Sequence, residues 1–146
     1  MFEPETLVAR VARALSGVPG VRVAFVFGSR VTRRARPDSD LDVGVVYARE
    51  LDGRGREDAR RDVCDALAAE LGALGERADV VDLDRCGAAI AFAALRDGCL
   101  ALARTEPERV AFAVRTMRRY DDDAPRRALF REAARRVASR GAVGRS

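Results

Sequence analysis

Two aspartates separated by a single residue follow a glycine–serine pair, and these side chains are the best suited in the sequence to chemistry. The pair is Gly28-Ser29, and ten residues later Asp40 and Asp42 open a second apolar run, Val43–Val46. Residues two apart on a strand point to the same face, so both carboxylates would project together, their backbones about 6–7 Å apart. Two like charges this close cost free energy unless a cation or proton relieves them, and oxygen ligands of this kind suit Mg²⁺.

The glycine–serine pair could bind phosphate beside the two carboxylates. It ends the apolar run Val21–Phe27, in which alternating residues indicate a strand. If the pair opens a short helix, free N–H groups and the hydroxyl of Ser29 can bind phosphate oxygens. The alternative is a plain turn followed by two solvated acids. Strands on both sides favour the first interpretation, which predicts phosphoryl or nucleotidyl transfer.

A third carboxylate comes from a later predicted strand, Ala78–Leu83, which carries Asp79 near its start and Asp82 near its end. These two residues lie on opposite faces. If this strand runs beside the Asp40 strand in the same direction, only Asp79 is level with the pair, and Asp82 is a strand-end or capping residue. Asp38 belongs to the turn before Asp40.

Composition bounds the remaining choices. The 146 residues are 48% hydrophobic and 34% charged, which predicts one globular domain over 1–146, with a core to about 104 and C-terminal helices over about 105–140. Without histidine, Ser-His-Asp and Cys-His catalysis are excluded. The three cysteines lack metal-binding spacing and predict reduced, buried thiols. With no signal peptide and no membrane-spanning run, we expect a cytoplasmic protein without a membrane partner.

The periodicity predicts an α/β (α+β) fold, a small mixed sheet flanked by helices. The predicted strands are Val21–Phe27, Asp40–Val46, Ala78–Leu83 and an edge strand, Gly98–Ala103. The predicted helices are Pro4–Ser16, Arg56–Leu74, Cys86–Leu95, one that begins after Thr105, and Arg126–Ser139. The helix Cys86–Leu95 is apolar nearly all round, so it is either deeply buried or lies against a partner. The last two helices carry apolar stripes expected to pack as core: Val110, Ala113, Val114 and Met117, then Leu129, Ala133 and Val137.

Charge is uneven along the chain. From Arg104 onward there are 12 arginines against 6 acidic residues, whereas the first 103 residues carry 15 against 17. A basic helical end can bind nucleic acid directly. Aromatic residues do not interleave with these arginines, so a protein partner or a solvated face is favoured.

Gly28-Ser29, ten residues, and then Asp40-x-Asp42 resembles the GSx10DxD signature of the polymerase-beta-like nucleotidyltransferases. The chain is most similar to their minimal MNT branch, which is paired with HEPN-domain toxins in toxin–antitoxin modules. Including the later Asp79 and the C-terminal helices, the resemblance spans most of the chain. One departure is the stretch 32–34, Thr-Arg-Arg, where members commonly carry a glycine.

The resemblance implies roles for these residues. Asp40 and Asp42 would carry Mg²⁺, and Asp79 would hold a second metal or take the proton from the attacking hydroxyl. Arg30 either neutralises the leaving pyrophosphate or is a surface residue. The implied nucleotide-binding residues are Gly28, Ser29 and Arg30.

The resemblance also implies an antitoxin that transfers AMP from ATP to a tyrosine of a cognate HEPN toxin, with which it forms a hetero-oligomer. Two alternatives stay open. One is an antitoxin that neutralises its toxin by binding alone. The other is nucleotidyl transfer to a small molecule, with a partner subunit supplying the acceptor pocket.

Overall fold

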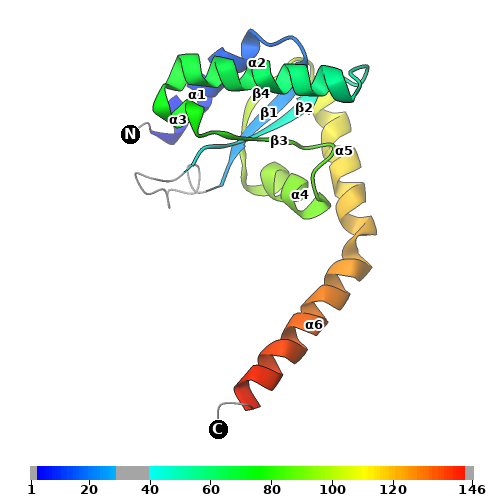
Figure 1. Ribbon diagram of the computed structural model, residues 1–146. Helices are drawn as coiled ribbons and strands as arrows, with labels where there is room; N and C mark the ends of the chain where they lie inside the picture. The colour runs from blue at the N-terminus through cyan, green and yellow to red at the C-terminus, as the bar shows by residue number, and fades with distance from the viewer. Residues whose placement is uncertain (1–2, 29–39, 144–146) are drawn as a thin grey trace.

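A four-stranded mixed sheet lies at the centre of the computed structural model, which describes residues 3–28 and 40–143 (Figure 1). The strands are β1 (Val21–Phe27), β2 (Asp42–Tyr47), β3 (Asp79–Asp82) and β4 (Cys99–Ala103). They lie in the order β3-β2-β1-β4, so β4 is an edge strand as predicted. β1 is antiparallel to β2 and β4, whereas β2 and β3 are parallel. This arrangement confirms the predicted α/β fold with a small mixed sheet.

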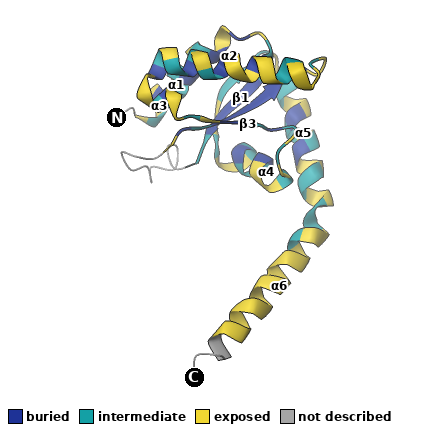
Figure 2. Ribbon diagram, in the orientation of Figure 1, coloured by how far each residue is buried: buried dark blue, intermediate teal, exposed yellow. Residues whose placement is uncertain are grey.

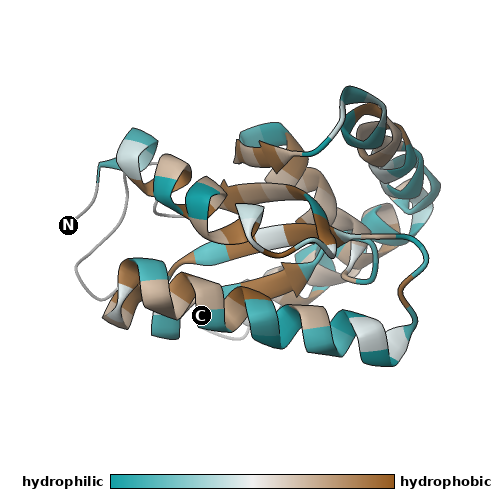
Figure 3. Cartoon of the chain, turned by 90° about the horizontal axis from the view of Figure 1, so that it is seen from above, coloured by the Kyte–Doolittle hydropathy of each residue, from teal (hydrophilic) through white to brown (hydrophobic). Residues whose placement is uncertain are grey.

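Two helical layers cover the sheet. On one face, α1 (Pro4–Ser16), α2 (Gly53–Leu71) and the short α3 (Ala73–Glu76) pack over one hydrophobic core. On the other face, α4 (Ala88–Asp97) and α5 (Glu106–Asp122) pack over a second, smaller core. The strands form the apolar middle layer between hydrophilic outer helix faces (Figure 3). The final helix, α6 (Ala124–Val143), runs away from both layers (Figure 1).

The central strand β1 is buried on both faces, which alternation alone does not indicate. Val23 and Phe25 belong to the core under α4 and α5, while Ala24 and Val26 belong to the core under α1 and α2. A central strand covered by two helical layers needs apolar residues in both phases. The nearly continuous apolar run of β1 meets that need.

Helix α2 differs from the prediction at both ends. It begins at Gly53 rather than Arg56, because the Asp52 side chain caps it by accepting a hydrogen bond from the Gly55 N–H at 2.7 Å. It ends at Leu71, because Gly72 takes a φ of +61°, a left-handed conformation that glycine adopts without strain. The predicted continuation to residue 74 is therefore wrong, and α3 occupies part of it.

The prediction that the apolar stripes of the last two helices form core is wrong. α5 instead buries Phe112 and Thr116, and leaves Val110, Val114 and Met117 exposed. On α6 the large apolar side chains are mostly exposed, as the colour of this helix shows (Figure 2). The helix α4 is also not deeply buried, since only Ala91 and Ala94 are shielded from solvent.

The structure tests two further predictions, that the cysteines are reduced and buried and that no segment spans a membrane. All three cysteines are free, but Cys64 and Cys86 are only half-buried and Cys99 is exposed, so the prediction of buried thiols is wrong. Within the described residues, no helix is both long and apolar enough to cross a membrane.

Candidate active site

The parallel pairing of β2 and β3 sets Asp42 and Asp79 side by side. Asp42 is level with Asp79 in the register of the two strands, and the Asp79 N–H donates to the Leu41 carbonyl at 2.8 Å. Burial raises the pKa of Asp42, and the negative charges of Asp79 and then Asp40 raise it further. The structure thus brings together the three carboxylates that the sequence singled out.

A glycine turn stands directly against the Asp42 carboxylate. The last residue of β1, Phe27, pairs with Asp42, so Gly28 follows at the same end of the sheet. Gly28 has a φ of +80°, and a Cβ added there would lie 2.3 Å from the Asp42 Oδ2. Any other residue would therefore be strained in its backbone and would displace the carboxylate.

Three residues of the predicted site region cannot be placed in the same way. Ser29, Arg30 and Asp38 lie outside the described residues. The predicted roles of Ser29 and Arg30 in holding nucleotide phosphates therefore stay predictions.

Asp82 points away from this cluster and is held by other partners. Its Oδ2 accepts a hydrogen bond from the Arg56 Nη1 at 3.0 Å, and its Oδ1 accepts one from the Asp84 N–H at 3.1 Å. Both members of the Arg56–Asp82 ion pair are largely shielded from solvent. Asp82 therefore fixes α2 and the end of β3, as expected for a strand-end residue, and Asp79 is the third acid of the cluster.

The family model described as polymerase beta, nucleotidyltransferase matches residues 10–106, which is more than half of the chain. The chain belongs to this nucleotidyltransferase family. The match includes all four strands and the carboxylates Asp40, Asp42 and Asp79. No curated protein sequence matches this nucleotidyltransferase.

Solved structures similar to this nucleotidyltransferase include toxin–antitoxin complexes. A chain of a toxin–antitoxin complex with AMP-PNP is 25% identical, with a TM-score of 0.67 over 87% of this chain and 98% of that one. A chain of a tyrosine-to-alanine variant of an MntA–HepT complex is 26% identical, with a TM-score of 0.63 over 86% and 95% of the two chains. A third, from the tri-AMPylated Shewanella oneidensis HEPN toxin in complex with MNT antitoxin, is 21% identical at a TM-score of 0.58, with 90% and 98% covered. This last likeness bears on the fold alone.

The chemistry of the carboxylates fits a divalent cation. Burial is the largest cause of the raised pKa of Asp42, and the negative charges of Asp79 and Asp40, which a cation would relieve, raise it further. Among the described residues, no group of three or more carboxylates and thiols is disposed to hold one ion. Mg²⁺ in phosphoryl-transfer sites commonly takes only one or two carboxylates and completes its shell with water and substrate phosphates. The pair Asp40 and Asp42 fits that mode.

Arginines that fix α5 against the loop after β3 were missed in the sequence. The Arg115 guanidinium donates to both oxygens of Asp84, at 2.7 and 3.0 Å, and the Arg119 Nη1 donates to the Leu83 carbonyl at 2.9 Å. These contacts hold the loop after β3, and with it the strand that carries Asp79. They join residues at least 31 positions apart, so no local pattern could reveal them.

Proposed function

We propose that this nucleotidyltransferase is a cytoplasmic antitoxin that transfers AMP from ATP to a tyrosine of a HEPN-domain toxin, with Mg²⁺ as cofactor. The observation that carries the proposal is the alignment of Asp42 with Asp79 beside the Gly28 turn. Family membership supports nucleotidyl transfer, and the similar toxin–antitoxin complex with AMP-PNP supports an adenine nucleotide and a toxin partner. Three free thiols are consistent with a reducing compartment.

Each carboxylate has a separate task in this proposal. Asp40 and Asp42 would hold the Mg²⁺, which neutralises charge on the nucleotide phosphates when bound. Asp79 is exposed at the start of β3, so it can reach the hydroxyl of an incoming acceptor and take its proton. Gly28 allows the chain to approach Asp42 closely, and the predicted contacts of Ser29 and Arg30 would orient the phosphates.

The acceptor's intact mass tests the proposal. The purified product of the neighbouring gene is incubated with ATP, Mg²⁺ and the wild-type chain, and we expect its mass to rise by one or more AMP units. Fragmentation should then locate the added group on a tyrosine. Chelation of divalent ions, or the double substitution Asp40→Asn with Asp42→Asn, should abolish the adduct. An unchanged acceptor mass under all conditions would refute the proposal.

Neutralisation by binding alone is the second candidate, because α6 exposes large apolar side chains that a partner could cover. The same double substitution separates the two. A binding antitoxin would protect cells equally well without the carboxylates, whereas an enzyme would lose protection while still binding its toxin.

A further inference from the structure

Helix α6 is covered only at its first turn by the rest of the described chain (Figures 1 and 2). Between residues 124 and 141, only Ala124 and Arg127 are partly buried, and the others are exposed. Helices in water gain little from backbone propensity and are normally stabilised by packing an apolar face. Within the described residues, α6 packs no such face.

The apolar side chains of α6 are large and gathered on one side. Leu129, Ala133 and Val137 follow one another at four-residue spacing, and Phe130 borders them. Leu129 is 69% exposed, Phe130 77% and Val137 70%. Side chains of this size gain free energy when an apolar surface covers them. A groove lined by apolar residues is the natural cover for a helix face of this kind.

The charge of α6 indicates which kind of molecule could cover its apolar face. The helix has a single glutamate, Glu132, which already pairs with Arg136 at 2.8 Å. Against it stand six arginines: Arg126, Arg127, Arg131, Arg135, Arg136 and Arg140. Two copies of such a helix would repel each other, whereas carboxylates on the rim of a groove would attract it.

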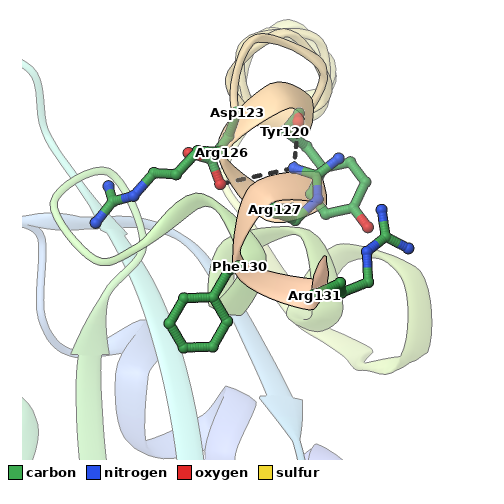
Figure 4. Close-up of a pocket in the computed structure, with 6 residues that line it drawn as sticks. All are labelled: Tyr120, Asp123, Arg126, Arg127, Phe130 and Arg131. Atoms are coloured by element: carbon green, nitrogen blue, oxygen red, sulfur yellow. Dashed lines mark hydrogen bonds and ion pairs between the residues drawn. The ribbon is translucent and has the colours of Figure 1, made fainter. Parts of the chain in front are cut away.

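The aromatic residues near α6 disfavour nucleic acid as the molecule that binds this helix. The Tyr120 ring is stacked on Phe92 at 3.9 Å between centroids and covered by the Arg127 guanidinium at 3.5 Å, so neither face is open to a base. Phe130 is the one aromatic residue on α6 itself and borders a hollow of about 470 Å³ at the α5–α6 junction (Figure 4). Aliphatic side chains such as Leu129 do not stack on bases.

We propose that α6 is the docking helix for a partner protein that presents a groove with an apolar floor and acidic rims. The inference rests on the proposed function, under which this partner is the protein that accepts AMP. α6 lies outside the sheet layers, whereas the carboxylates lie at the end of the sheet where β1 ends and β2 begins (Figure 1). Docking and transfer therefore use different parts of the chain and can be separated by substitution.

The test uses the full chain with Leu129→Glu and Val137→Glu together. Both positions are exposed, so the fold should be retained, which circular dichroism and the melting temperature check. The control, Arg61→Glu on the solvent face of α2, makes the same change in net charge on the opposite side of the sheet. Titration calorimetry measures binding of the purified neighbouring gene product and, separately, of Mg-ATP. We expect at least about 100-fold weaker partner binding by the double variant, as for two interface hot spots, and unchanged Mg-ATP binding.

Four results would overturn the inference. The double variant could bind the partner as tightly as wild type, or wild type could fail to bind it. Alternatively, light scattering could show that wild type alone dimerises and the variant does not, or the variant could lose affinity for a single-stranded RNA probe instead. The proposed function fails independently, if the partner binds through α6 but its mass never changes. Conversely, if wild type and variant transfer AMP equally well, the proposed function holds but α6 is not the docking helix.

Discussion

Replacing Asp42 with asparagine should make the ligand-free protein more stable and the ligand-bound protein less stable. Asp42 is half-buried beside Asp79 and Asp40, and burial and these two charges together raise its pKa. Like charges on neighbouring strands destabilise a sheet by about 0.2–1 kcal/mol. For a chain of this size, 1 kcal/mol corresponds to roughly 3 °C in melting temperature, so Asp42→Asn should melt about 1–3 °C higher.

Bound nucleotide should reverse this order. A ligand at 100 times its dissociation constant stabilises the native state by about 2.7 kcal/mol, or roughly 8 °C here. The wild type should gain this increment from Mg-ATP, whereas the variant should gain little because one of the two expected metal ligands is gone. The assay is thermal unfolding by differential scanning fluorimetry, with and without Mg-ATP, supported by calorimetric affinities.

The pH dependence of the ligand-free protein's stability tests whether the raised pKa of Asp42 causes the difference in melting temperature. A carboxyl whose pKa is raised by folding binds its proton more tightly in the native state, so it stabilises the fold at low pH. As pH rises from its ordinary value of 3.8 through the raised pKa, that stability is lost. The stability advantage of Asp42→Asn over wild type should therefore grow across this interval and then stay constant.

Asp82→Asn is the matched control, with the opposite expected sign. It removes half of the Arg56–Asp82 ion pair, whose side chains are only 14% and 20% exposed, and should cost about 1–2 kcal/mol. If ligand-free Asp42→Asn melted below wild type as Asp82→Asn does, attraction rather than repulsion would hold Asp42. That result would refute the reasoning.

Three further predictions compare variants at the site with variants elsewhere in the fold. Asp79→Ala should slow AMP transfer by roughly 10²–10³ with Mg-ATP binding retained, while Asp82→Ala keeps turnover in the folded fraction, as intact-mass time courses would show. Gly28→Ala should weaken Mg-ATP binding and lower stability by about 1–3 kcal/mol, whereas Gly72→Ala, which also has positive φ but no atom within 4 Å of the added Cβ, should lower stability alone. Arg104 donates to the carbonyls of residues 15, 16, 18 and 21, so Arg104→Ala should cost about 1.5–3 kcal/mol in denaturant unfolding and leave calorimetric Mg-ATP affinity unchanged.

The position of Asp79 beside Asp42 could be predicted because all but one step depended on short-range strand geometry. The sequence predicted Asp40 and Asp42 on one strand, but β2 begins at Asp42, so strand alternation does not apply to Asp40. The odd separation of Asp79 and Asp82 places these on opposite faces. The one long-range assumption was that the later strand runs parallel to β2. The structure has that direction, with Asp42 level with Asp79.

Helix boundaries were harder to predict where capping competes with periodicity. The apolar stripe of α2 repeats through Leu71 and could continue to Leu74, so periodicity alone extends the helix. The positive φ of Gly72 ends it instead, and Gly75, the first residue after the predicted helix, is buried within α3. A sequence with two glycines near the end of a stripe does not indicate which one takes the left-handed conformation.

The exposed stripe of α5 shows what periodicity cannot decide. Spacing places Val110, Val114 and Met117 on one helix face, but it does not say whether that face turns toward the sheet. The orientation is set by a larger side chain, because Phe112 is fully buried with its ring centroid 5.7 Å from that of Phe25. Arg115 and Arg119 hold the same orientation through the loop after β3. An apolar helix face that does not pack on its own chain gains free energy when another protein covers it. The apolar side chains of α6 are exposed in the same way, which is why we infer a partner protein for that helix.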